Sequence, residues 1–236
     1  MQTGAREQRY VPAAGRAGLT GLYDPVMALT MREGRWRPAL LAEVDRRLPL
    51  AGTVVDVGAG TGSVAIALAA ARPDARVVAV DGDQEALDRA RVMAGAETVA
   101  WRPGLAGGLP LRSGGADAVV MSLLLHHLEP AAKQAALDEA VRVLRPAGWL
   151  HIADWGRPRG LLPRAGFAAL RTLDGPEGTR DHAAGRLPAL VRDAGFAGTS
   201  VWMRLATIWG TLELLSGSLV DRHRTDPAQP PTGQAP

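Results

Sequence analysis

One acid and three glycines stand directly behind a run of β-branched apolar residues, in the stretch VVDVGAGTG at 54–62. Glycine is needed where a backbone must turn tightly and approach a ligand without a Cβ in the way. In open parallel sheets, ligands bind at the carboxyl ends of the strands. This stretch therefore predicts a ligand-binding loop after the first strand.

The spacing of this loop distinguishes between ligands. It reads D-x-G-x-G-x-G, with Asp56, Gly58, Gly60 and Gly62 at the fixed positions and Ala59 inside. A dinucleotide fingerprint would place glycine where Ser63 stands, and no Gly-Lys-Ser/Thr of a phosphate loop follows. Asp56 would repel a pyrophosphate, whereas a ligand with an ammonium and a sulfonium would be attracted.

Further groups that could do chemistry follow later strands. Two histidines, His126 and His127, come after an apolar run, and Asp154 ends another. A histidine titrates near neutral pH and could deprotonate a phenol or an acidic carbon. Alternatively, one histidine caps a helix and the other packs under a cofactor. Asp154 could orient a substrate hydroxyl or a histidine, or it could cap a helix or pair with Arg157 or Arg159.

The elements that position these groups alternate regularly. Apolar runs rich in Val, Ile, Leu and Ala predict buried strands, and they are separated by segments with helical periodicity. The predicted strands are 53–57, 75–80, 97–101, 116–122 and 148–154, and the predicted helices are 35–48, 62–71, 83–94, 131–144 and 183–196. A hairpin over 199–216 is expected to end the fold. This order predicts an α/β protein with a mostly parallel sheet covered on both faces.

Composition excludes several classes of function. The 236 residues, 47% of them hydrophobic, are enough for one domain. Cysteine is absent and the five histidines show no metal-binding spacing, so no metal site is expected. The net charge of +3 is spread along the chain, which argues against nucleic acid as a partner. No apolar run is long enough to span a membrane and no secretory signal begins the chain, so a cytoplasmic protein is expected.

Together these motifs resemble the class I S-adenosylmethionine-dependent methyltransferases. Their first motif is an acid followed by G-x-G-x-G, and their second is an acid at the end of the next strand, here Asp81. The stretches LPLRSGGADAVVMSLLLHHL and EAVRVLRPAGWLHIADWGRP are similar to the subgroup of ubiquinone and menaquinone biosynthesis C-methyltransferases. The resemblance implies a Rossmann-like seven-stranded sheet of order 3-2-1-4-5-7-6, with strand seven antiparallel and an N-terminal helical cap.

The resemblance also implies how S-adenosylmethionine would be held. Asp81 would accept hydrogen bonds from both ribose hydroxyls, and Tyr23 and Arg37 would close over the methionine carboxylate. Leu105 stands where the family often has an aspartate for the adenine amino group, so adenine would need backbone and apolar contacts. The implied cofactor set is completed by Asp56, Gly58, Ala59, Gly60, Gly62, Gly82, Ala106 and Ser122.

The resemblance predicts a methyltransferase acting at carbon or oxygen of a small-molecule acceptor, in secondary metabolism. A quinone or lipid acceptor, or a non-methylating reaction such as cyclisation, stays open. The expected organisation is a mobile 1–18, one domain over 19–220 and a disordered tail over 221–236. Within the domain we expect a cap (19–50), a cofactor-binding core (51–155) and acceptor-side helices with the hairpin (156–220). Trp202, Met203 and Trp209 could pack in the core, line an acceptor pocket or form a homodimer interface.

Overall fold

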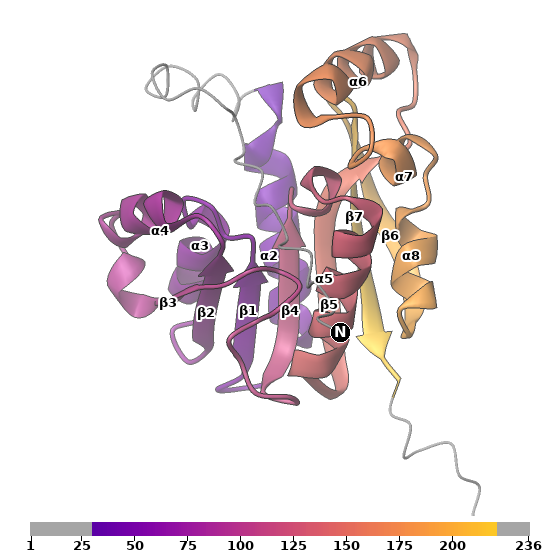
Figure 1. The fold of residues 1–236 in the computed structure, drawn as a ribbon. Helices are drawn as coiled ribbons and strands as arrows, with labels where there is room; N and C mark the ends of the chain where they lie inside the picture. Colours follow the sequence, from indigo (N-terminus) through magenta and orange to yellow (C-terminus); the bar gives the residue numbers. More distant parts are fainter. Residues whose placement is uncertain (1–29, 221–236) are drawn as a thin grey trace, which may run out of the picture.

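A computed structural model describes residues 30–220, which form one seven-stranded sheet of order β3-β2-β1-β4-β5-β7-β6 (Figure 1). Strands β1 to β5 are parallel neighbours, and β7 is antiparallel to both β5 and β6. The strands are β1 Thr53–Val57, β2 Arg76–Asp81, β3 Ala100–Pro103, β4 Ala116–Ser122, β5 Leu144–Gly156, β6 Phe196–Ala206 and β7 Thr211–Leu219. The predicted α/β class, strand order and terminal hairpin are confirmed.

Helices cover both faces of this sheet (Figure 1). The apolar residues of α2 and α3 pack on one face, and those of α5 and α8 pack on the other. Two short 3-10 helices, η1 Ala96–Thr98 and η2 Leu125–His127, lie in connections. The α-helices are α2 Glu33–Arg47, α3 Ser63–Ala71, α4 Gln84–Arg91, α5 Pro130–Val143, α6 Leu161–Asp174, α7 Arg180–Ala183 and α8 Leu187–Asp193. No described helix is both long and apolar enough to cross a bilayer.

Local sequence accounts for these elements. In β1, four consecutive residues from Val54 are buried because a central parallel strand is covered on both faces. Helix α4 begins where the Asp83 side chain accepts hydrogen bonds from the amides of Glu85 and Ala86, at 2.9 and 3.2 Å. Proline in the first turn of α5 needs no amide partner there.

Several predicted boundaries are wrong, each for a local reason. The helix predicted over 83–94 ends at Arg91, and Gly95, with φ of 87°, precedes η1 where the third strand was expected to begin. Strand β5 follows α5 at once from Leu144, so 144–147 is not a connection. The helix predicted over 183–196 is the shorter α8, Leu187–Asp193, which is separated from α7 by Gly185, whose φ is 71°.

The C-terminal hairpin separates the aromatic residues that the sequence grouped. Trp209 packs against the core and donates its indole N–H to the Thr30 hydroxyl at 3.0 Å. Trp202 lies on the edge strand β6 and is 37% exposed. The predictions for residues 1–29 and 221–236, including the terminal segments and the start of the cap, lie outside the described residues.

Candidate functional site

The glycine loop is tied to the end of β2 by its own amides. Gly58 and Ala59 donate to the carbonyl of Val80 at 2.8 and 3.1 Å. Gly60 donates to Oδ2 of Asp81 at 2.7 Å. The loop after the first strand and the acid after the second, which the sequence pattern predicted as one site, are therefore joined directly.

The glycines of this loop have different surroundings. All three have positive φ, at 70°, 54° and 80° for Gly58, Gly60 and Gly62. A Cβ on Gly58 would come within 2.6 Å of Leu124, and one on Gly62 would overlap the ring of Trp101. A Cβ on Gly60 would meet nothing within 4 Å. The loop is thus packed at its two ends and open at its centre, where a ligand can approach the backbone.

Asp81 lies beside this opening. Its Oδ2 accepts the Gly60 amide, and its Oδ1 accepts the amide of Asp83 at 2.8 Å, which makes a tight turn around Gly82. Each carboxylate oxygen can accept a further hydrogen bond. Because the side chain is only partly buried, both oxygens can also meet hydroxyl groups of a ligand.

Asp56 lies inside β1, below the glycine loop, and its side chain is fully buried. Neither carboxylate oxygen has a hydrogen-bond partner among the described residues. Burial, together with the negative charge of Asp81, raises the pKa of Asp56 to about 7. A cationic group bound near the loop would favour ionisation of this carboxyl.

Three other predicted cofactor residues border the same edge of the sheet. Leu105, which is 40% exposed, and Ala106 lie in the turn after β3. That turn is held to β2 by the Gly104 amide, which donates to the carbonyl of Asp81 at 2.9 Å. Ser122 is the last residue of β4.

Of the two predicted residues of the N-terminal cap, the structure describes only Arg37. Arg37 pairs with Glu33 one turn earlier in α2, and its guanidinium lies 5.6 Å from the ring centroid of Trp36. Its Nε is buried without a hydrogen-bond partner among the described residues. Tyr23 lies outside the described residues.

The carboxyl end of β5 supplies a buried acid. Asp154 accepts the amides of Leu125 and Trp155 at 2.8 and 2.7 Å, and its Oδ1 lies 2.7 Å from Nδ1 of His126. Burial acts to raise the pKa of Asp154, but His126, His182 and these hydrogen bonds outweigh it and hold the pKa below its usual range. Asp154 thus contacts a histidine, and it also accepts the amides of Leu125 and His126 at the start of η2, at 2.8 and 3.3 Å, as a helix cap does.

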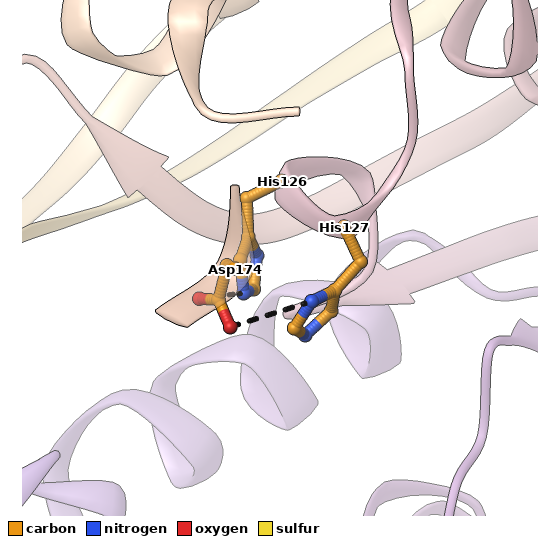
Figure 2. A group of neighbouring side chains, drawn as sticks. All are labelled: His126, His127 and Asp174. Atoms are coloured by element: carbon orange, nitrogen blue, oxygen red, sulfur yellow. Dashed lines mark ion pairs between the residues drawn. The ribbon is translucent and has the colours of Figure 1, made fainter. Parts of the chain in front are cut away.

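The two histidines face a third group that the sequence analysis did not single out. Asp174, at the end of α6, has one oxygen 3.7 Å from Nε2 of His126 and the other 3.8 Å from Nδ1 of His127 (Figure 2). The two imidazole centroids lie 3.9 Å apart. Burial and the neighbouring His126 lower the pKa of His127 to about 3, so that ring is neutral at physiological pH.

The backbone under these histidines is held in an unusual conformation. Leu123 follows β4 with φ of 51°, and its amide donates to the carbonyl of Ala153 at 2.8 Å. A non-glycine residue rarely adopts positive φ, and such positions occur often at functional sites. The next residue, Leu124, is the one that packs against Gly58. The turn over residues 123–127, called the histidine turn below, is therefore adjacent to the glycine loop.

Residues around this site hold the connection from α6 to α7. His182 is buried, with Nδ1 2.6 Å from the carbonyl oxygen of Trp155. Lys133 of α5 is buried and contacts the Gly178 carbonyl and, at 3.3 Å, the carboxylate of Asp181. These contacts fix the segment that follows Asp174.

The fold and the site together define a class of protein. A seven-stranded sheet with only β7 antiparallel, and a glycine loop bound to an acid at the next strand end, are the features of the class I methyltransferase fold. A structure from Thermotoga maritima, described as a SAM-dependent methyltransferase and possible histamine N-methyltransferase, superposes with a TM-score of 0.64. It is 22% identical and covers 85% of this chain and 95% of that one, which shows the shared fold.

Comparison of sequences shows which proteins the chain is similar to. Residues 54–148 match the methyltransferase domain model. A ubiquinone/menaquinone biosynthesis C-methyltransferase of Syntrophotalea carbinolica is 32% identical over 130 residues, 54% of this chain and 53% of that one. A demethylmenaquinone methyltransferase of Clavibacter sepedonicus is 36% identical over 134 residues, 56% and 52% of the two chains. The match spans about half the length of these relatives. The chain is similar in sequence to the S-adenosylmethionine-dependent methyltransferases, including the quinone C-methyltransferases among them.

Proposed function

We propose that this protein transfers the methyl group of S-adenosylmethionine to a carbon or an oxygen of a small-molecule acceptor. The observation that carries the proposal is the hydrogen bond from Gly60 to Asp81, which joins the open glycine loop and the strand-end acid in one site. The cofactor supplies an electrophilic methyl group on a sulfonium when bound. The fully buried Asp56, with both oxygens unpartnered among the described residues, fits a cationic ligand.

We assign different parts of this cofactor to different described residues. Asp81 would accept hydrogen bonds from the ribose hydroxyls, and the open face of Gly60 would admit the ligand to the loop backbone. Leu105 and Ala106 would give adenine an apolar contact in place of the family's usual aspartate. Ser122, Gly82, Arg37 and Tyr23 complete the proposed set.

On the acceptor side, we propose that the histidine turn positions the acceptor and accepts its proton. His126 is held through Nδ1 by Asp154, which leaves Nε2 to receive a proton from an acceptor hydroxyl or an acidic carbon. His127 has a lowered pKa and is a poor base, so its contribution is contact with the acceptor. Much of the rate of an in-line methyl transfer can come from orientation and exclusion of water.

The acceptor class is open within this proposal. The names of the relatives favour a quinone precursor, whereas a role in secondary metabolism rests on departures from their motifs such as Leu105. A non-methylating reaction of S-adenosylmethionine, such as cyclisation, would use the same cofactor site. The 37% exposed Trp202 on the edge strand would support a homodimer.

Asp81 tests the cofactor site. Replacing it, Asp81→Ala, is expected to weaken S-adenosylmethionine binding at least tenfold in calorimetric titration, because hydrogen bonds to a charged group contribute roughly 1.5–3 kcal/mol. Asp81→Asn keeps the shape and separates loss of charge from loss of fold. Asp193→Ala, an exposed acid at the end of α8, is the matched control.

The same titration is run with S-adenosylhomocysteine and with NAD. Binding of the first two ligands and not of NAD is the expected result. Binding of NAD alone, or S-adenosylmethionine affinity unchanged by Asp81→Ala, would overturn the proposal. Formation of S-adenosylhomocysteine with an acceptor then separates methyl transfer from the non-methylating alternative.

A further inference from the structure

We propose that His126, His127 and Asp174 form a binding site for a divalent transition-metal ion. One ligand atom from each of the three side chains lies within 4.8 Å of the other two. Figure 2 shows the three side chains next to one another. The carboxylate oxygens are 3.7 and 3.8 Å from the two imidazole nitrogens, too far for hydrogen bonds. The three groups thus face one another across a gap without bonding directly.

The size of the gap suits a metal ion. With metal–ligand bonds of about 2.0–2.2 Å, neighbouring ligand atoms of a tetrahedral site lie about 3.4 Å apart. The two histidine–carboxylate distances exceed this by only a few tenths of an ångström. The separation of up to 4.8 Å among the three ligand atoms would have to close by rotation of His127, whose side chain is 30% exposed.

A second observation is the support of His126. Its Nδ1 lies 2.7 Å from Asp154, which in turn accepts the amides of Leu125 and Trp155. Histidines that bind metals almost always donate their other ring N–H to a carboxylate or carbonyl group, which fixes the ring and its tautomer. If Nδ1 donates in this way, Nε2, which lies 3.7 Å from Asp174, is the nitrogen of His126 that would bind the metal.

A third observation is the position of Asp174. It is the last residue of α6, where the helix dipole disfavours a negative charge. In the described part of the chain it has no hydrogen bond and no Lys or Arg partner, and its only charged or chargeable neighbours within 4 Å are the two histidines. A cation between the three groups would offset the unfavourable placement of this carboxylate.

The donor set points to the class of metal. Two imidazoles and one carboxylate suit Zn²⁺, Co²⁺, Fe²⁺ or Mn²⁺, and three protein ligands leave coordination positions open. Resting on the proposed function, those positions would take an oxygen of the acceptor. The cation would then lower the pKa of an acceptor hydroxyl, and Nε2 of His126 would act as a ligand rather than as the base.

The test uses the full chain without an affinity tag, after treatment with EDTA. Titration with Co²⁺, followed by visible absorption, and with Zn²⁺, followed by calorimetry, is expected to show one equivalent bound. His127→Gln and Asp174→Asn are each expected to weaken binding at least tenfold. Asp193→Asn, an exposed acid outside the cluster, is expected to bind as the unchanged protein does.

Absence of saturable one-equivalent binding would overturn the inference, and so would binding that neither cluster variant weakens. Both replacements keep side-chain size, and thermal unfolding of each variant checks the fold. S-adenosylmethionine titration of the same samples separates the two proposals. Cofactor binding without metal binding would contradict the metal site alone. Metal binding without cofactor binding would contradict the proposed function alone.

Discussion

Asp56 is a buried acid with its pKa raised from 3.8 to about 7, because burial and Asp81 both disfavour its charged form. The folded state therefore holds a proton that the unfolded chain releases at lower pH. The contribution of this proton to stability is complete below about pH 4 and is lost as the pH rises through about 7. Without a bound cation, the ionised carboxylate destabilises the fold above neutral pH.

Asp56→Asn is expected to remove this pH dependence. The difference in unfolding free energy between variant and unchanged protein should favour the variant increasingly from pH 4 to pH 8, by up to roughly 4 kcal/mol. Urea unfolding at several pH values without cofactor measures it, and the comparison cancels the titration of all other groups. Parallel pH profiles of the two proteins would contradict the interpretation of Asp56.

Residue identity and spacing predicted the cofactor side of the site better than the acceptor side. The glycines and Asp81 lie at fixed offsets from two strands, so the sheet itself places them together. Asp174 had no such signal, because it ends a helix in a segment outside the alternating pattern. Its meeting with His126 depends on where α6 packs, which no local pattern specifies.

At the scale of elements, the loop between β1 and α3 offers a matched pair of substitutions. Gly60 and Gly62 both have positive φ, so alanine strains either position by about 1 kcal/mol. Only at Gly62 would the added Cβ overlap the ring of Trp101. Gly62→Ala is therefore expected to lower the unfolding free energy by a further ~1–3 kcal/mol.

Gly60→Ala should act on binding more than on stability, since its Cβ would fill the open face of the loop. The measurements are the denaturation midpoint and the S-adenosylmethionine affinity of both variants. Equal destabilisation by the two substitutions would mean that the ring of Trp101 moves aside without cost. Unchanged affinity in Gly60→Ala would mean that the ligand does not approach the loop there.

The elements themselves were predictable where the pattern was strong. Strands covered on both faces read as continuous apolar runs, and β1, β2 and β4 were placed within a residue of their bounds. The predicted bounds of helices and strands were wrong where a single residue sets the backbone conformation. Gly185, with φ of 71°, separates α7 from α8 within a run of helical hydrophobic periodicity, and that periodicity alone does not predict an interruption of the helix.

Across the whole molecule, the two sides of the site depend on different parts of the fold. The glycine loop and Asp81 belong to β1 and β2, near one edge of the sheet (Figure 1). Asp174 belongs to α6, which packs against the turn between β6 and β7: a Cβ on Gly166 would overlap the carbonyl oxygen of Ile208. The position of Asp174 is therefore set by the hairpin at the opposite edge.

Gly166→Ala tests this division. The added methyl must push α6 away from the hairpin, so a loss of ~1–3 kcal/mol of stability is expected. Because α6 carries Asp174, the affinity for Co²⁺ should also fall, while S-adenosylmethionine affinity stays within about twofold. Gly34→Ala in α2, whose Cβ would meet nothing within 4 Å, is the control and should keep or raise stability. A parallel loss of cofactor affinity in Gly166→Ala would contradict this division and show that the two sides are coupled through the histidine turn, where Leu124 adjoins Gly58.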